Sequence, residues 1–230
     1  MKIAAIAIII TLLALLIVMW RRRRRGIRAD YIRTYGFPPG LYEKIRKQRP
    51  ELSLKDCQLV GQALRHFFLA YLQGNRRFVS MPSQVTDELW HAFILYTQHY
   101  EIFCSKAFGG FLHHIPAAAL SQNRQNNAGL RRIWWLSCRE ENIDPRKPSR
   151  LPLLFAIDNK LKINDGFFYL PDCRGVRRDD DDGKTPYCGT DFSSADFDGS
   201  LDGFGDWLDG GDGIFSGDGG CGGGCGGGGD

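Results

Sequence analysis

Hydrophobic residues open the chain in one unbroken run. Ile3 to Trp20 is a stretch of 18 residues without a charge, and Thr11 is its only polar side chain. As an α-helix rising 1.5 Å per residue, the run would span about 27 Å, close to the thickness of one hydrocarbon core. The pattern therefore predicts a transmembrane helix over residues 3–20.

A cleaved signal peptide is the rival interpretation of this run. Such a peptide needs a positively charged start and small residues at a cleavage site after the apolar stretch. Here only Lys2 precedes the run, and arginines occupy the place of the cleavage site, so we expect the helix to remain as an anchor. Positive charge beside a short apolar segment stays cytoplasmic, which predicts a single-pass protein with a cytoplasmic body (in a bacterium, at the inner membrane).

The residues that flank the run suit a membrane surface. Trp20 lies where an interfacial aromatic belongs, and it is followed directly by Arg21, Arg22, Arg23, Arg24 and Arg25. Arginines at this position attract anionic head groups with about 1 kcal/mol each, so a bilayer with anionic lipids is the first predicted partner. A nucleic-acid role for the cluster is the weaker explanation, and we expect no nucleic-acid partner.

Behind a basic connector over residues 21–40, apolar residues recur at helical spacing as far as residue 172. Glycines and prolines divide this region into segments, and Ser53 and Ser83 are suited to cap two of the helices. The predicted helices are 41–48, 54–73, 84–107, 130–138 and 151–161, with 121–129 as a polar loop and 167–170 as a short strand. The expected fold class is mainly α, with one helical domain over 41–172.

The composition changes sharply near residue 179. Residues 1–178 hold 29 Lys and Arg against 13 Asp and Glu, whereas residues 179–230 hold one Lys against 13 Asp and contain 18 of the 28 glycines. This sorting excludes a uniform globule, a collagen and a disulfide-dense secreted mini-protein. A Gly- and Asp-rich segment cannot bury enough apolar surface to offset the entropy of ordering, so we predict a disordered acidic tail over residues 173–230.

Seven cysteines are spread along the chain. In a reducing cytoplasm we expect them to be mostly free, metal-bound or redox-active rather than joined in structural disulfides. Cys221 and Cys225, separated by three glycines, would suit a soft metal ion or a redox pair, although a glycine scaffold does not pre-organise two thiols. The Asp–Gly stretches of the tail lack the 12-residue loop of an EF-hand, and the chain has no P-loop, GxSxG or GxGxxG motif.

The densest cluster of chemistry-bearing side chains lies between residues 87 and 114. Asp87 and His91 are four residues apart and share a helix face, so the carboxylate can orient the imidazole or share a metal ion with it. A turn at Gly109-Gly110 would bring a later histidine back towards His91. Imidazole and carboxylate ligands suit Zn²⁺ or another transition metal. The candidate metal or ligand site comprises Asp87, His91, Cys104, His113 and His114.

The alternative to a metal site is a structural role for the same cluster. Asp87 and His91 would then be a satisfied pair at the edge of a core, and His113-His114 a polar plug in a turn. No ligand spacing in the chain matches HExxH or a Cys₂His₂ zinc finger. The sequence alone therefore predicts the cluster without deciding between metal binding and structure, and it assigns no catalytic residue.

The stretch Pro82–Thr97 (PSQVTDELWHAFILYT), followed by Tyr100-x-x-Phe103-Cys104, Phe108-Gly109 and His113-His114-x-Pro116, resembles the core motif of the glycine-rich-domain protein-like family. The resemblance covers residues 79–117, with looser similarity back to Leu41. It implies one domain around His91 and a glycine-rich tail, and it implies no assigned activity. Plant relatives often read Trp-His-x-His, whereas this chain has Phe93 at the second histidine, which removes one candidate ligand.

These patterns predict a non-enzymatic, membrane-tethered binding or scaffolding module. Its acidic tail would engage a protein partner or fold back onto the basic part of the chain, and a long tail raises the effective concentration of whatever it binds. The alternative is a metal-dependent, hydrolase-like enzyme with His91, His113 and His114 as ligands and Asp87 as orienting group or base. A third hypothesis is a metal or redox sensor that uses Cys221 and Cys225.

Overall fold

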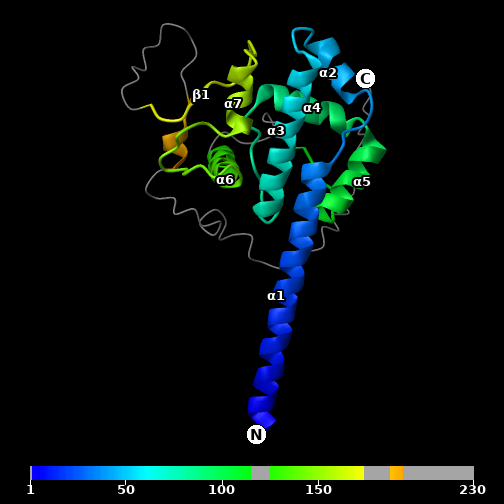
Figure 1. Cartoon of the computed structure of the whole chain (residues 1–230), viewed down its shortest axis with the longest axis vertical. Helices are drawn as coiled ribbons and strands as arrows, with labels where there is room; N and C mark the ends of the chain where they lie inside the picture. The colour runs from blue at the N-terminus through cyan, green and yellow to red at the C-terminus, as the bar shows by residue number, and fades with distance from the viewer. Residues whose placement is uncertain (1, 115–124, 174–186, 194–230) are drawn as a thin grey trace, which may run out of the picture.

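The computed structural model describes residues 2–114, 125–173 and 187–193 (Figure 1). This part of the chain is mainly helical, and the small amount of β-structure lies near its C-terminal end. The elements are α1 (Lys2–Thr34), α2 (Leu41–Gln48), α3 (Leu54–Gln73), α4 (Gln84–Ile94), α5 (Thr97–Phe108), α6 (Gln125–Glu140), α7 (Leu153–Lys160), β1 (Tyr169–Leu170), β2 (Tyr187–Cys188) and the 3₁₀-helix η3 (Gly189–Ser193).

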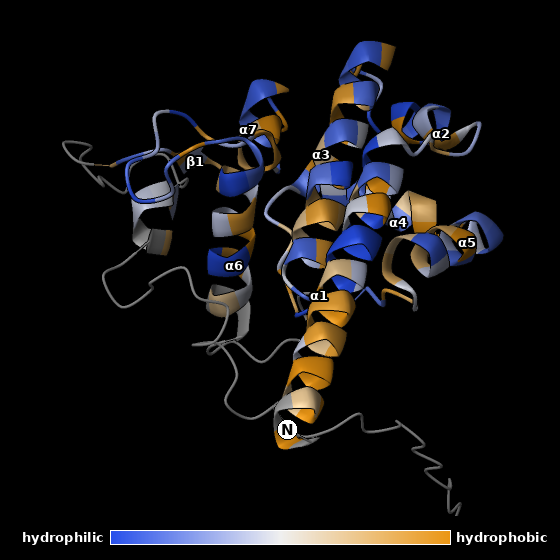
Figure 2. Cartoon of the chain, turned by 60° about the horizontal axis from the view of Figure 1, so that its bottom comes forward, coloured by the Kyte–Doolittle hydropathy of each residue, from blue (hydrophilic) through white to orange (hydrophobic). Residues whose placement is uncertain are grey.

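The first helix, α1, leaves the body of the molecule as a long stalk (Figure 1). Its large apolar side chains between Ile3 and Trp20 are exposed, and the ribbon of this part of α1 has the colour of hydrophobic residues in Figure 2. With a mean hydropathy of 2.1 over its most apolar stretch, α1 is long and apolar enough to cross a membrane, and a signal sequence near the N-terminus would have the same features.

The basic segment predicted as a connector belongs to the same helix as far as Thr34. Beyond the arginines, Ala29 and Ile32 are buried in the core of the body. Tyr31 stacks on Phe103 of α5 with ring centroids 6.0 Å apart. The stalk and the body are therefore joined by a continuous helix that packs against the body.

Helix α3 is the centre of the body and lies against α1, α2, α4, α6 and α7. It begins with the predicted capping box: Asp56 N donates to Ser53 Oγ at 3.2 Å, and Ser53 N donates back to Asp56 Oδ2 at 2.9 Å. Helix α3 approaches α2 closely at Gly61, where a Cβ would lie 2.5 Å from the Tyr42 hydroxyl. The predictions of helices over 41–48 and 54–73 are confirmed.

The predicted single helix over 84–107 is wrong, because the chain breaks into α4 and α5 between Ile94 and Thr97. The break folds α5 back so that both helices share one aromatic core: the ring of Phe93 contacts those of Tyr100 at 5.2 Å and Phe103 at 5.5 Å. No glycine or proline marks the break. The break lets aromatic side chains of α4 and α5 bury their rings against one another, which residues stacked along one straight helix could not do in this arrangement.

The remaining elements form a second layer beside α3 (Figure 1). Helix α6 begins at Gln125, so residues 125–129, predicted as polar loop, are helical. Helix α7 confirms the prediction over 151–161. The strand predicted over 167–170 is present as β1, which pairs in parallel with β2 in the register Tyr169–Tyr187.

The start of the predicted disordered tail requires a correction. Cys173 forms a disulfide with Cys188, and Phe192 of η3 is buried with its ring 5.8 Å from that of Trp134 on α6. Residues 187–193 thus belong to the packed body, because they cover apolar surface on α6. The expectation that cysteines avoid structural disulfides is wrong for this pair, whereas Cys57, Cys104 and Cys138 are free and buried. Residues 194–230, including Cys221 and Cys225, lie outside the described residues.

Candidate functional site

Asp87, His91 and His114 come together on the surface of the body. The Nε2 atom of His114 lies 3.1 Å from Asp87 Oδ1, and the Nδ1 atom of His91 lies 3.3 Å from Asp87 Oδ2. The two imidazole rings are 4.1 Å apart between centroids. Within the described residues, this is the one group of three or more His, Cys, Asp or Glu side chains whose ligand atoms all lie within 4.8 Å of one another.

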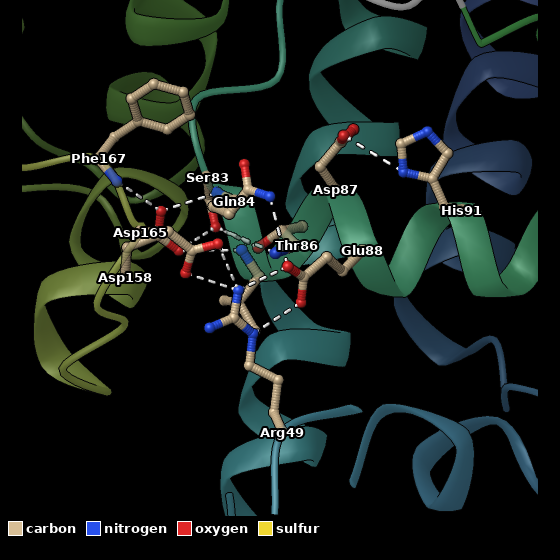
Figure 3. Close-up of polar contacts among 11 residues, drawn as sticks. Arg49, Ser83, Gln84, Thr86, Asp87, Glu88, His91, Asp158, Asp165 and Phe167 are labelled. Atoms are coloured by element: carbon tan, nitrogen blue, oxygen red, sulfur yellow. Dashed lines mark hydrogen bonds and ion pairs between the residues drawn. The ribbon is translucent and has the colours of Figure 1, made fainter. Parts of the chain in front are cut away.

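Two of the three side chains stand one turn apart on α4 and point towards each other (Figure 3). The side chain of His91 is 52% exposed, whereas that of His114 is 13% exposed. One histidine therefore faces solvent and the other is held against the body. The cluster is open on the His91 side, where a water molecule or a further ligand has access.

A buried carboxylate on α7 fixes the start of α4. Asp158 is 2% exposed and accepts hydrogen bonds from Ser83 Oγ at 2.7 Å, from the backbone N–H groups of Gln84 and Val85 at 2.7 and 3.3 Å, and from Phe167 N at 3.0 Å. Figure 3 shows these bonds converging on the first turn of the helix. An anion here satisfies orphan N–H groups and complements the positive end of the helix dipole.

A second anchor for α4 is Arg49, which follows α2. Its guanidinium donates to both carboxylate oxygens of Glu88 on α4, at 2.9 and 2.6 Å, and to Asp165 at 2.8 Å. The hydrogen bond to Glu88 is the main reason that the pKa of Arg49 lies above its ordinary value. Because Glu88 is the neighbour of Asp87, this fork fixes the turn that carries the candidate ligand (Figure 3).

The turn after α5 brings His114 to α4. Gly109 ends α5 in the left-handed conformation, with φ of 76°, which a residue without a Cβ adopts at no steric cost. The buried hydroxyl of Tyr100 accepts from Trp90 Nε1 at 3.1 Å and donates to the carbonyl of Leu112 at 2.6 Å. The His114 ring then packs edge-on against Trp90 at 4.6 Å. Burial raises the pKa of Tyr100, so its hydroxyl remains a donor.

Two of the predicted site residues do not join the cluster. Cys104 is fully buried beside Tyr100. Burial raises the pKa of this thiol, which keeps it protonated and chemically inert. His113 is exposed and its ring contacts Phe111 at 4.8 Å. The structure therefore selects His114 from the adjacent pair of histidines and leaves Cys104 in the core.

The donor set suits a zinc ion. The imidazole nitrogens of His114 and His91 lie 3.1 and 3.3 Å from two different oxygens of Asp87, Oδ1 and Oδ2. One ligand atom of each residue lies within 4.8 Å of the others, and tetrahedral ligands about 2.0–2.1 Å from Zn²⁺ lie about 3.3 Å from one another. Two imidazole nitrogens and one carboxylate would leave one position open. The same geometry also serves a carboxylate that accepts hydrogen bonds from two imidazoles, which is the structural alternative.

Comparison with known families finds a match to a family described as UCP032817-like, over residues 27–192. The chain belongs to the UCP032817-like family. No curated protein and no solved structure matches it. The UCP032817-like family is uncharacterised and carries no link to the glycine-rich-domain protein-like family, so that resemblance stays a prediction. The matched range runs from Ile27 of α1 to Phe192 of η3.

The supporting residues of the site in this UCP032817-like protein escape sequence reasoning. Asp158 and Arg49 are 71 and 38 residues from Asp87 in the chain, and neither forms part of a recognisable motif. A weak signal exists for Asp158 alone, because an acidic residue in the middle of the apolar helix 151–161 needs a partner when it is buried. The partner, the start of α4, is visible only in the folded chain.

Proposed function

We propose that this UCP032817-like protein is a single-pass membrane protein whose helical body is a non-enzymatic binding module for a divalent transition-metal ion. The observation that carries the proposal is the convergence of Asp87, His91 and His114, with ligand atoms within 4.8 Å of one another. The ligand-bearing helix is fixed at its N-terminus by Asp158 and Arg49. Such rigid support is what a pre-organised metal site requires.

Membrane attachment is the second part of the proposal. Helix α1 is exposed and apolar over its N-terminal half and packs into the body at Ala29 and Ile32. If its apolar half spans a bilayer, the continuous helix holds the metal site in a defined orientation to the membrane. The arginines after Trp20 favour a body on the cytoplasmic side.

Metal binding is tested on the full-length chain, purified in detergent without a chelator and without a histidine tag. We expect about one equivalent of Zn²⁺ by elemental analysis and titration, because three protein ligands and one open position suit a single zinc ion. His91→Ala and His114→Ala should lose it. His113→Ala is the matched control, because it removes the neighbouring histidine that the structure leaves outside the cluster. Equal metal content in the wild type and all three variants, or no metal in any of them, would contradict the proposal. Asp87 would then have only the structural role of a carboxylate that accepts hydrogen bonds from two imidazoles.

A metal-dependent hydrolase is the second candidate function, because three protein ligands and an open position are typical of catalytic zinc sites. Two cavities of about 410 and 310 Å³ are lined by residues other than these ligands. The zinc-loaded protein is assayed with nitrophenyl esters of phosphate and of acetate. Turnover that disappears in His114→Ala would favour the enzyme, and we expect no turnover.

The acidic tail remains part of the proposal as the site of a protein partner. Its residues 194–230 lie outside the described residues, as do the thiols of the sensor hypothesis, Cys221 and Cys225. Deletion of 194–230 keeps Phe192 and the Cys188 pairing, so it removes the tail without opening the body. We expect this deletion to abolish any salt-sensitive partner binding while metal binding is retained.

A further inference from the structure

A basic pocket lies where α1 leaves the body. It has a volume of about 410 Å³ and is lined on one side by Arg21, Arg24, Arg25 and Arg28 of α1, and on the other by Asn75 and Arg76 of the turn after α3. A second cavity of about 310 Å³ shares Asn75 and Arg76 and extends towards Phe108. The arginines that flank the apolar run therefore form one wall of a built cavity.

The opposite wall is held by a strained turn. Asn75 and Arg76 both adopt the left-handed conformation, with φ of 56° and 62°, which is uncommon for a residue with a Cβ. The turn is tied to α1 by a hydrogen bond from Arg25 Nη2 to Asn75 Oδ1 at 2.7 Å. Arg76 also donates to the carbonyl of Phe108 at 3.3 Å. These contacts hold Arg76 opposite the arginines of α1.

Five arginine side chains line the pocket, and no carboxylate of the described residues pairs with them. By contrast, Arg33, further along α1, pairs with Glu140 at 2.7 Å. Arg28 follows the apolar run of residues 3–20. Burial and the positive charges of Arg24 and Arg76 lower the pKa of its guanidinium. An anion in the pocket would relieve this mutual repulsion.

The position of the pocket along α1 matches the head-group layer of a bilayer. Arg21 to Arg25 lie up to about 8 Å beyond Trp20 along the helix axis, and the polar layer of one leaflet is about 5–8 Å deep. Arg24 stacks over the Trp20 ring at 4.6 Å from its centroid. Trp20 and Leu72 add apolar surface to the wall, so the cavity offers cationic and apolar groups to the same ligand.

We propose that this pocket binds the phosphate group of an anionic phospholipid in the leaflet next to the body. Guanidinium groups recognise phosphate through paired N–H donors, and the apolar wall suits the glycerol and acyl region of a lipid rather than a free ion. The inference rests on the proposed membrane span of α1 and is independent of the metal site. A lipid held between α1 and the turn after α3 fixes the angle of the body to the membrane.

The experiment uses the full-length chain in mild detergent and counts bound lipid by native mass spectrometry during titration with phosphatidylglycerol. The test variant is Arg28→Gln with Arg76→Gln, which removes one charge from each wall and leaves Arg21 to Arg25 intact. The matched control is Arg46→Gln with Lys47→Gln, two exposed cations of α2 at the far end of the body (Figure 1). We expect the test variant to bind the lipid about 30-fold more weakly and the control to bind it unchanged.

Three results would overturn the assignment: equal binding by the test variant and the wild type, equal binding of phosphatidylcholine, or displacement of the lipid by inorganic phosphate or an oligonucleotide at lower concentration. Helical content by circular dichroism, unchanged in both variants, shows that the comparison is made on folded protein. Extraction of membranes with alkaline carbonate tests the proposed membrane anchor independently of the lipid-binding pocket. Release of the wild-type chain contradicts the anchor, whereas retention without lipid preference contradicts the pocket alone.

Discussion

One carboxylate, that of Asp158, supports the start of α4 and through it the candidate site. It accepts hydrogen bonds from Ser83 Oγ and from the N–H groups of Gln84 and Phe167, and it is almost fully buried. Hydrogen bonds to a buried charge contribute more than neutral ones, and the loss of one partner leaves donors unsatisfied. The N-terminus of α4 thus depends on a residue from a different helix.

We therefore expect Asp158→Asn to lower the free energy of unfolding by about 2–4 kcal/mol, because an amide group accepts fewer of these bonds and carries no charge. Asp165→Asn is the matched control. Its carboxylate is exposed and pairs with Arg49, so its loss should cost about 1 kcal/mol or less. Denaturant unfolding of the full chain in detergent measures both. Equal effects of the two substitutions would contradict the capping role of Asp158.

Glu141, just after α6, gives the stability of the body a dependence on pH. Burial alone would raise the pKa of its carboxyl, but interactions with His66, Arg150 and the backbone N–H of Leu153 hold the pKa below its ordinary value. A carboxyl whose pKa is lower in the folded state stabilises the fold above the unfolded value, about 4.3. That contribution is lost as the pH falls through the lower folded value.

The free energy of unfolding, measured between about pH 6 and pH 3, should accordingly fall towards the acid end. In Glu141→Gln it should be lower at pH 6 and should change less over the same range. Glu101→Gln, an exposed glutamate of α5, serves as the control and should keep the wild-type profile. Parallel profiles for wild type and Glu141→Gln would show that this carboxyl does not carry the acid dependence.

At the scale of single elements, local signals in the sequence located most helix ends. Ser53 with Asp56 predicted the start of α3, and Ser83 predicted that of α4, because a capping side chain acts on backbone groups only two or three residues away. The break between α4 and α5 has no such local signal. It results from packing Phe93 against Tyr100, a contact that exists only after the chain has folded back.

The residues of the candidate site were also predicted only where the signal was local in the sequence. Helical spacing placed Asp87 beside His91, and both are in the cluster. Helical spacing could not choose between His113 and His114, because that choice depends on the hydrogen bond from Tyr100 to Leu112. It also included Cys104, which the break in the helix directs into the core.

Tyr100→Phe tests how α5 positions His114. The substitution keeps the ring in the core but removes the hydroxyl that joins Trp90 to the turn, so the free energy of unfolding should fall by about 1–2 kcal/mol. Loss of a group that orients a ligand also weakens metal binding, and we expect about a 10-fold lower affinity for Zn²⁺. Tyr96→Phe is the control. An unchanged Zn²⁺ affinity in Tyr100→Phe would show that the turn is held by other contacts.

At the scale of the whole molecule, segregation of charge and hydropathy predicted the stalk and the helical body. It missed the return of residues 187–193 to the body, because the parallel pairing of β2 with β1 and the contact of Phe192 with Trp134 join distant segments. The same pairing places Cys188 of β2 next to Cys173, with which it forms a disulfide. A disulfide is typical of an oxidising compartment, whereas the arginines of α1 favour a cytoplasmic body.

The two signals predict opposite sides of the membrane, and a labelling experiment decides between them. Lys47 on α2 is exposed, so Lys47→Cys introduces an accessible thiol when Cys173, Cys188, Cys221 and Cys225 are replaced by serine. Membrane-impermeant maleimide is applied to intact cells and, as the control, to lysed cells. Because flanking arginines resist translocation during insertion, we expect labelling only after lysis. Labelling of intact cells would place the body on the opposite side of the membrane, in an oxidising compartment where a disulfide such as Cys173–Cys188 is typical.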